Sequence, residues 1–289
     1  MRAFLLIFLL IFHISVLAQK HTISGYVSDF ETGESVIGAN IFSNDYSAGV
    51  SSNKYGFYSI TLNEGVHVIS FKFIGYETIT KEFNLNKDIE FNAEFKLSSI
   101  ITDEVTVTGK ANVVQRTETS VIEIPIQQIK SIPALMGEVD VLKAVQLLPG
   151  VQSSEGTSGF YVRGGSPDQN LILMDGVPVY NVSHIGGLFS VFNADAIKNV
   201  RLTKGGFPAR YGGRLSSVLE IDMKDGNMKE FKADATVGLI SSKLMIEGPI
   251  VKDKTSFIVA GRRTYIDLFV RPFMPNNTAL TLHFYDLNA

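Results

Sequence analysis

This chain of 289 residues opens with an apolar run of nine residues, Phe4 to Phe12, which is too short to span a membrane. A helix needs about 20 apolar residues to span a bilayer. Arg2 precedes the run, and Val16-Leu17-Ala18 follows it with the small residues that a signal peptidase reads. We therefore predict a secretory signal peptide at residues 1–18, cleaved after Ala18, with an uncleaved anchor as the alternative.

No second long apolar run follows, so any membrane insertion of the remaining chain must use strands. A hydrophobic content of 45% is that of an ordinary globular protein and excludes a disordered one. The 26 basic and 29 acidic residues give a net charge of -3, which provides no electrostatic basis for nucleic-acid binding. The chain has no cysteine, which excludes disulfides and a thiolate nucleophile.

Residues 19–98 show the period-two alternation of half-buried strands. It appears in Ile23 to Val27, in Tyr58 to Leu62 and in Val66 to Phe73, and turn residues such as Thr32-Gly33 separate the runs. Strands at this spacing without a helical stretch predict a compact β-sandwich of about seven strands.

Four short motifs in this region resemble the carboxypeptidase-regulatory-like (transthyretin-like) module: Ile23-Ser24-Gly25-Tyr26-Val27, Gly38-Ala39-Asn40-Ile41, Tyr55-Gly56-Phe57-Tyr58 and Phe73-Ile74-Gly75-Tyr76. The resemblance does not imply peptidase chemistry, because a zinc site needs His or carboxylate ligands at helix or turn spacing. No Glu stands three or four residues after any of His21, His67, His184 and His283. We interpret these histidines as surface or strand residues and expect neither a metal nor a cofactor.

Residues 99–120 form a linker that contains the alternating segment Thr102 to Gly109. Such a segment is extended by propensity and exposes main-chain donors and acceptors unless another strand pairs with it. It is a candidate for capture by the sheet edge of a partner protein. The alternative is an ordinary first strand of the following domain.

Residues 121–225 change to a mixed pattern, which predicts an α+β domain. Asp140 is placed to cap a helix whose apolar face includes Val141, Leu142, Val145 and Leu148, and Pro149-Gly150 ends it. Short strands follow, separated by turns that are unusually rich in glycine.

The order of motifs in this domain resembles the plug domain of TonB-dependent outer-membrane receptors. The motifs are Val141-Leu142-Lys143-Ala144 through Pro149-Gly150-Val151, Tyr161-Val162-Arg163-Gly164-Gly165, Leu173-Met174-Asp175-Gly176-Val177-Pro178, and Ile197 to Gly206 followed by Ala209 to Arg214. The plug-motif residues carried over from the family are Arg163, Gly164, Gly165, Asp175, Gly176, Gly205, Gly206, Arg210, Tyr211, Gly212 and Gly213. Beside these glycines, Arg163 and Arg210 are candidates to reach carboxylates of a surrounding barrel wall, with solvated surface arginines as the alternative.

The resemblance also implies partners and a location. The family's plug is a globular stopper inside a barrel of the cell outer membrane, and a periplasmic energy-transducing protein of the TonB type pulls on a docking segment called the TonB box. By position this segment is Asp103, Glu104, Val105, Thr106, Val107 and Thr108. The sandwich is then periplasmic, the barrel contacts outer-membrane lipid, and the substrate is a small solute or oligomer. A surface lipoprotein is a further candidate partner.

Residues 226–289 read as the first strands of a membrane β-barrel. In the first strand Phe231, Ala233, Ala235, Val237 and Leu239 are placed to face lipid, while Lys232, Asp234, Thr236 and Gly238 face a lumen. Without the plug beside them, these strands are equally consistent with a soluble sandwich. Bacterial single-chain barrels have at least about 8 strands, so we expect the chain to be a fragment or the product of a truncated gene, with a loose tail.

These predictions favour one function. The leading hypothesis is the N-terminal part of a TonB-dependent outer-membrane transporter that takes up a scarce solute. The alternative is a secreted binding or signalling module built from the same domains without transport. No convergent polar triad, phosphate loop or nucleophile elbow supports an enzyme.

Overall fold

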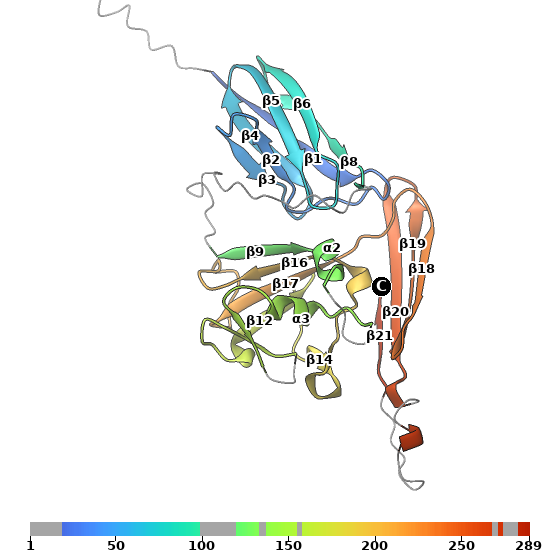
Figure 1. The fold of residues 1–289 in the computed structure, drawn as a ribbon. Helices are drawn as coiled ribbons and strands as arrows, with labels where there is room; N and C mark the ends of the chain where they lie inside the picture. The colour runs from blue at the N-terminus through green and yellow to red at the C-terminus, as the bar shows by residue number, and fades with distance from the viewer. Residues whose placement is uncertain (1–18, 99–119, 133–136, 155–157, 268–270, 274–282) are drawn as a thin grey trace, which may run out of the picture. The chain divides into compact units, whose positions relative to one another are not determined.

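The computed structural model describes residues 19–98, 120–132, 137–154, 158–267, 271–273 and 283–289. These residues form two compact units. One is a β-sandwich; the other contains a mixed α/β domain and a four-stranded antiparallel sheet (Figure 1). The predicted signal peptide and the predicted docking segment, Asp103 to Thr108, lie outside the described residues.

The sandwich consists of two sheets. In the first, β1 pairs with β4 and β7, and β8 also pairs with β1; the second has the order β3-β2-β5-β6. The bounds are β1 Lys20–Asp29, β2 Asn40–Ser43, β3 Gly49–Ser51, β4 Phe57–Asn63, β5 Gly65–Lys72, β6 Ile79–Leu85, β7 Ile89–Glu90 and β8 Ala93–Phe95. The predicted sandwich is thus confirmed, with eight strands. Because β7 and β8 are so short, alternation does not reveal them.

Alternation places the core of the sandwich. In β4 every second side chain is buried, so Tyr58, Ile60 and Leu62 face inward. They meet Ile69 and Phe71 of β5, and the rings of Tyr58 and Phe71 make an edge-to-face contact with centroids 5.3 Å apart. Aromatic contacts of this kind add to the stabilisation from apolar burial.

The mixed domain, here called the plug domain, is built on a five-stranded sheet with the order β13-β12-β17-β16-β9. Strands β12 and β17 are parallel, and the other neighbours are antiparallel. The bounds are β9 Val121–Pro125, β12 Asn170–Met174, β13 Val177–Pro178, β16 Ile197–Thr203 and β17 Ser217–Met223. Two small hairpins accompany this sheet, β10 Val151–Ser153 with β11 Phe160–Val162, and β14 Ser183–His184 with β15 Phe189–Ser190.

The helices of the plug domain are short: α2 Ile126–Lys130, α3 Val141–Gln146, and the 3-10 turns η2 Pro167–Gln169, η3 Ile185–Gly187 and η4 Ala194–Ala196. Asp140 caps α3 as predicted, because its carboxylate accepts hydrogen bonds from the backbone N–H groups of Leu142 at 2.9 Å and Lys143 at 3.1 Å. Val141, Leu142 and Val145 pack in the core against the sheet. Among the described residues, no helix has the length and apolar character needed to cross a bilayer.

The sequence suggests alternation from Leu215 to Met223, but the structure shows consecutive burial at Ser217, Val218 and Leu219. Strand β17 is the middle strand of five, and the consecutive burial shows that both of its faces are covered at its start, so the period-two pattern is lost there. Leu215 lies before the strand and is largely exposed.

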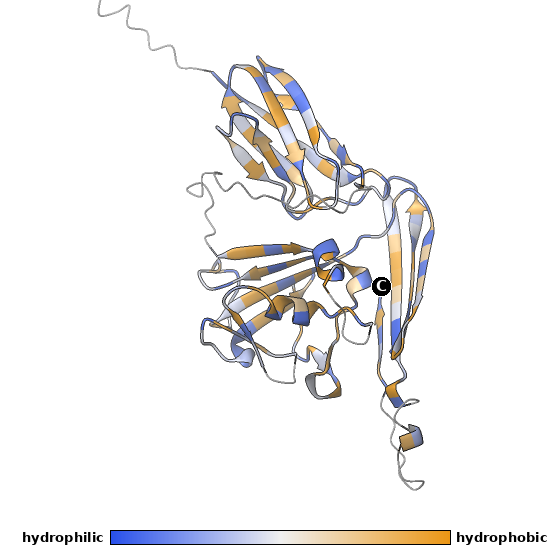
Figure 2. Cartoon of the chain, viewed as in Figure 1, coloured by the Kyte–Doolittle hydropathy of each residue, from blue (hydrophilic) through white to orange (hydrophobic). Residues whose placement is uncertain are grey.

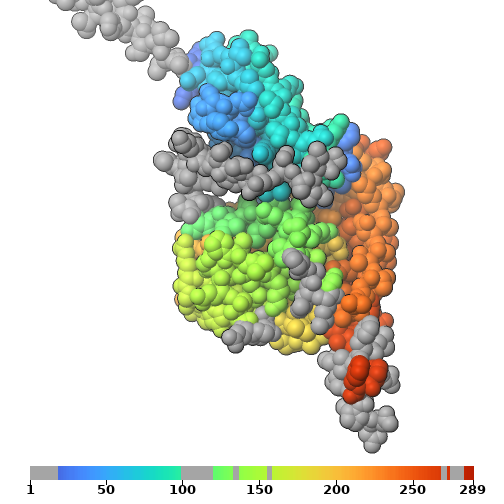
Figure 3. Space-filling view, in the orientation of Figure 1, coloured from blue at the N-terminus to red at the C-terminus, as the bar shows by residue number. Residues whose placement is uncertain are grey.

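The last sheet, here called the wall sheet, has the order β18-β19-β20-β21 and is antiparallel throughout. Its strands are β18 Lys232–Val237, β19 Ser241–Val251, β20 Thr255–Thr264 and β21 Tyr285–Asn288, and η5 covers Arg271–Phe273. In Figure 2 the wall strands show both apolar stretches, in orange, and polar ones, in blue. In Figure 3 the wall sheet, orange to red, lies against the plug domain, green to yellow.

A charged seam between the plug domain and the wall sheet

One row of side chains crosses all four wall strands and faces the plug domain. The register pairs Thr236 with Lys243, Lys243 with Arg262, and Arg262 with Asp286. The side chain of Arg262 is buried, and those of Lys243 and Asp286 are only 10% and 11% exposed. Because side chains alternate between the two faces of a strand, the rows on either side of this one point the other way. Val237 lies in one of these rows, with Ser242, Arg263 and Tyr285, and Leu287 lies in the other, with Ala235, Leu244 and Gly261. Val237 and Leu287 are 84% and 74% exposed. This orientation agrees with the predicted lumen and lipid faces.

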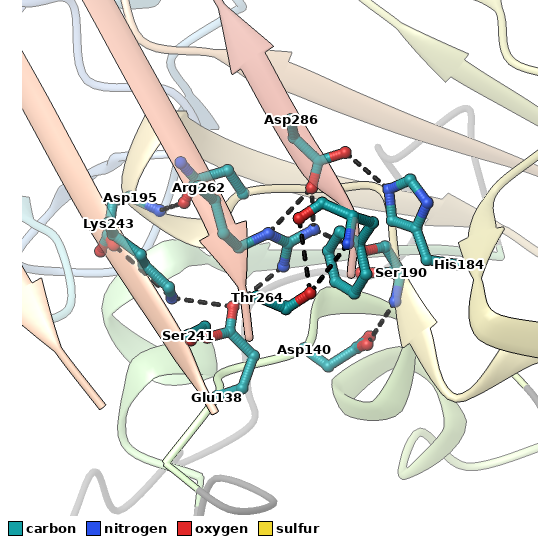
Figure 4. A network of polar contacts seen from close by, with 12 residues as sticks. Glu138, Asp140, His184, Ser190, Asp195, Ser241, Lys243, Arg262, Thr264 and Asp286 are labelled. Atoms are coloured by element: carbon teal, nitrogen blue, oxygen red, sulfur yellow. Dashed lines mark hydrogen bonds and ion pairs between the residues drawn. The ribbon is translucent and has the colours of Figure 1, made fainter. Parts of the chain in front are cut away.

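Glu138, in the segment before α3, meets this row from the plug side (Figure 4). Its Oε1 accepts from Arg262 Nη1 at 2.9 Å and lies 3.0 Å from Lys243 Nζ, and its Oε2 accepts from Ser241 Oγ at 2.6 Å. The side chains of Glu138 and Arg262 are each only 1% exposed. A buried charge is tolerated only when it is paired and hydrogen-bonded, and these three contacts satisfy that condition for the carboxylate.

Arg262 also binds two partners other than Glu138, namely Asp286 of the wall and Ser190 of the plug domain. Its Nε and Nη2 donate to Asp286 Oδ2 at 2.9 and 2.5 Å, and Nη2 donates to the backbone oxygen of Ser190 at 2.7 Å. His184 Nε2 lies 2.6 Å from Asp286 Oδ1. The planar guanidinium therefore joins two strands of the wall to two segments of the plug, which an ammonium group has too few directed donors to do.

Asp195, in η4, extends this network of contacts, here called the charged seam, beyond Lys243. Its carboxylate lies 2.8 Å from Lys130 Nζ and 3.7 Å from Lys243 Nζ. Burial acts to raise the pKa of Asp195, but the hydrogen bond and charge of Lys130 and the charge of Lys243 outweigh it, so the net shift lowers this pKa. The result is a chain of alternating charges that runs Lys130, Asp195, Lys243, Glu138, Arg262 and Asp286, and Asp286 also contacts the ring of His184.

Apolar contacts flank the charged row. Phe189, Ile240 and Phe284 form a small buried cluster, and the rings of His184 and Phe284 stack with centroids 4.0 Å apart. Ile185 in this hairpin has a φ of 48°, which a β-branched residue rarely adopts. The plug hairpin is thus held against the wall in a backbone conformation that costs free energy, and the surrounding contacts offset that cost.

The predicted plug-motif residues lie elsewhere in the plug domain, in two groups. In the first, Arg163 has a φ of 49° and donates to Ser120 Oγ at 3.0 Å, with its guanidinium close to Gly205. Gly164, Gly205 and Gly206 have positive φ, whereas Gly165 is required for space, because a Cβ there would lie 2.5 Å from Ser216 Oγ. Asp175 and Gly176 form the two-residue turn between β12 and β13, both with positive φ.

The second group precedes β17. Tyr211 donates to Glu220 Oε1 at 2.6 Å, and the guanidinium of Arg210 lies over the Tyr211 ring at 4.6 Å. Burial, followed by the bond to Glu220, raises the pKa of Tyr211. Gly213 has a φ of 82°, and Gly212 has open space around it. In the structure Arg163 and Arg210 bind within the plug domain, and the arginine that joins plug and wall is Arg262.

Sequence reasoning missed the charged seam. The interpretation of His184 as a surface or strand residue is correct, since it ends β14, but its contact with Asp286 and its stacking on Phe284 were not predicted. A signal was present in the wall strands, because Lys243 and Arg262 occupy positions that alternation assigns to the lumen face. For Glu138 there is no periodic signal, since it lies in a connection. Among the described residues, no group of three or more His, Asp or Glu side chains is arranged to hold a metal.

The architecture defines a class of protein. A mixed α/β domain is paired by buried charges to the inner row of an antiparallel sheet whose other face is apolar and exposed. Such an arrangement is that of a plug domain seated on the wall of an outer-membrane receptor.

Comparison with known proteins supports this class. Residues 23–107 match the CarboxypepD_reg-like domain, and residues 113–217 match the TonB-dependent Receptor Plug Domain. TonB-dependent receptor SusC of Bacteroides thetaiotaomicron is 32% identical over 227 residues, which are 74% of this chain and 22% of SusC. The chain therefore spans about a fifth of the length of this relative.

Solved structures give weaker likenesses. The siderophore receptor PirA of Pseudomonas aeruginosa matches with a TM-score of 0.38 and 21% identity, over 50% of this chain and 29% of that one. The outer membrane transporter YddB of Escherichia coli matches with a TM-score of 0.37 and 14% identity, over 50% and 26% of the two chains.

The chain carries the TonB-dependent Receptor Plug Domain and is similar over 74% of its length to a TonB-dependent receptor. It carries a carboxypeptidase-regulatory-like domain ahead of the plug domain. This similarity assigns it to the cell outer membrane.

Proposed function

We propose that this chain supplies the periplasmic module, the plug and the first wall strands of an outer-membrane transporter that takes up a scarce solute. A partner of the TonB type binds Asp103 to Thr108 and pulls, the plug loosens from the wall, and a path opens beside it. The energy comes from the partner, so the chain acts as a transporter and needs no resident cofactor or catalytic centre.

The charged seam carries this proposal. Ion pairs with both members buried are costly to form and weaken steeply when one member is withdrawn, because the remaining charge is left without a partner. A plug held in this way stays closed at rest, yet a modest displacement of Glu138 releases several contacts together. Apolar packing alone lacks this directionality.

The exposed apolar row of the wall disfavours the alternative of a secreted soluble module. Val237, Leu244 and Leu287 point away from the plug and are more than half exposed. Isolated apolar side chains are normal on soluble proteins. The row Ala235, Leu244, Gly261 and Leu287, with one residue from each of the four strands, has no polar side chain and is suited to lipid.

The membrane assignment is tested by charge placed on this row. Leu287→Arg in the full chain is expected to lower the yield in the outer-membrane fraction, since arginine on a lipid-facing barrel position costs about 2 to 4 kcal/mol near the midplane. Val177→Arg is the matched control, because Val177 is also exposed but lies on the plug hairpin. Equal yields of the two variants contradict lipid contact at this face.

Partner docking is tested separately. The peptide of residues 98–120 is titrated into a 15N-labelled TonB C-terminal domain, and amide shifts confined to one strand edge are expected. Val107→Pro removes a backbone donor and is expected to abolish the shifts, whereas Val107→Ala keeps the donor and retains them. An unchanged spectrum with the native peptide rules out this docking segment.

A further inference from the structure

The wall sheet carries an unusual pair of like charges. Lys243 on β19 and Arg262 on β20 are directly opposite in the register, and their side chains are only 10% and 1% exposed. Like charges at directly opposed positions destabilise a sheet. The wall's Asp286 balances one of them, so two cations against one anion leave this row with one excess positive charge. The row therefore requires an anion from outside the sheet.

Glu138 is that anion, and the wall binds it as it would bind a ligand. Each hydrogen bond or ion pair of its carboxylate among the described residues comes from a wall side chain: Ser241, Lys243 or Arg262. Three donors from two adjacent strands converge on two oxygens, which is the chemistry of carboxylate recognition. The site is thus built entirely by β19 and β20, and the plug contributes only the occupant.

Lys243 of this site also lines a cavity. Its volume is about 220 Å³, and its lining includes Lys130, Lys224, Lys243, Asn193, Asp195 and Asp234. Three lysines against two aspartates leave one net positive charge. Lys224 makes no ion pair with any described residue, while Asp195 is held by Lys130. Lys243 is shared between the cavity and the Glu138 site, so an anion in the cavity lies next to the bound carboxylate.

We infer that Ser241, Lys243 and Arg262 form a carboxylate-binding site of the wall that the plug fills with Glu138 at rest and that a carboxylate of the passing solute fills when Glu138 withdraws. This rests on the proposed transport function and narrows its substrate to acidic solutes. The exchange keeps the two wall cations paired at each stage, so the plug leaves without exposing unpaired buried charge.

Chemical rescue of the full chain tests the site. Glu138→Ala removes the carboxylate and opens its space, so thermal unfolding is expected to shift to lower temperature. Sodium formate is expected to restore most of that shift, whereas sodium chloride at the same concentration, and therefore the same ionic strength, is expected to restore less than about a tenth of it. Glu138→Gln is the matched control: it lacks the charge but fills the space, and formate is expected to leave its unfolding temperature unchanged.

The outcomes separate clearly. Equal rescue by formate and chloride, or rescue of both variants, overturns the site, because the effect is then general screening. Rescue by phosphate without rescue by formate overturns the carboxylate assignment. If Glu138→Ala does not fold in chloride, folding in formate supports the site and failure in both salts overturns it. Since this measurement involves neither a TonB-type partner nor transport, its result is independent of the docking and uptake tests.

Discussion

Arg262 and Glu138 are 124 positions apart in the chain, and their side chains are joined at 2.9 Å with 1% of each exposed. The guanidinium reaches the plug on one side and Asp286 on the other, so a single side chain links β20, β21 and the segment before α3. This linkage makes the seam a unit in which each charge depends on its neighbours.

The first prediction concerns the shape of the cation at this position. Arg262→Lys keeps the charge but cannot bridge Glu138, Asp286 and the Ser190 carbonyl together. We expect a loss of about 2 to 3 kcal/mol in the free energy of unfolding, measured by denaturant titration. Arg263→Lys is the control, because Arg263 is exposed on the opposite face of β20, and a change below about 0.5 kcal/mol is expected. Equal losses contradict a directed role for the guanidinium.

The second prediction concerns the glycines of the plug motif. In Gly165→Ala the new Cβ meets Ser216 Oγ and Cβ at 2.5 and 2.6 Å, so one of the two segments must shift. We expect the free energy of unfolding, measured by denaturant titration, to fall by about 1 to 3 kcal/mol. Gly212→Ala is the control, since it has no neighbouring atom within 4 Å and no positive φ. A neutral Gly165→Ala contradicts the close approach.

The third prediction concerns the start of α3. Asp140 caps the helix with Oδ1 and accepts from the backbone N–H of Ser190 with Oδ2 at 2.7 Å. Asp140→Ala removes both functions and is expected to cost about 2 kcal/mol. Asp140→Asn retains one acceptor oxygen and is expected to lose less. Hydrogen exchange at the Leu142 and Ser190 amides checks both contacts, and unchanged protection in the alanine variant speaks against them.

The fourth prediction concerns pH. Burial, followed by the charge of Glu220, raises the pKa of Asp222 in the folded protein, so the folded state binds a proton more tightly than the unfolded state. The ionised carboxylate therefore destabilises the fold at neutral pH, and this penalty disappears as pH falls below the unfolded pKa of about 4. Asp222→Asn is expected to raise the unfolding midpoint at pH 7 but not at pH 3.5.

The pKa of Asp195 is shifted in the opposite direction from that of Asp222 and provides a comparison. Its folded pKa is lowered, so its ionised form stabilises the fold above the unfolded value of about 4, and that stability is lost as pH falls through the folded pKa. Asp195→Asn is expected to lower the midpoint at pH 7 and to change it little at the most acidic pH. If the two variants respond to pH in the same direction, the assigned environments are wrong.

Local patterns in the sequence determined much of this protein. The alternation of β4 and of the wall strands depends on the two-residue repeat of an extended chain, so it identifies inner and outer faces without knowledge of the fold. Asp140 and the Asp175-Gly176 turn follow in the same way from the backbone hydrogen bonds and φ angles of a few consecutive residues.

Only the tertiary structure decided which residues meet across the seam. No local rule places Glu138 between Lys243 and Arg262, because Glu138 lies in a connection more than a hundred residues earlier. His184 pairs with Asp286 for the same reason, through a contact 102 residues apart. Burial of opposite charges is a property of the packed domains, since it depends on the desolvation that arises only when the plug and the wall come together.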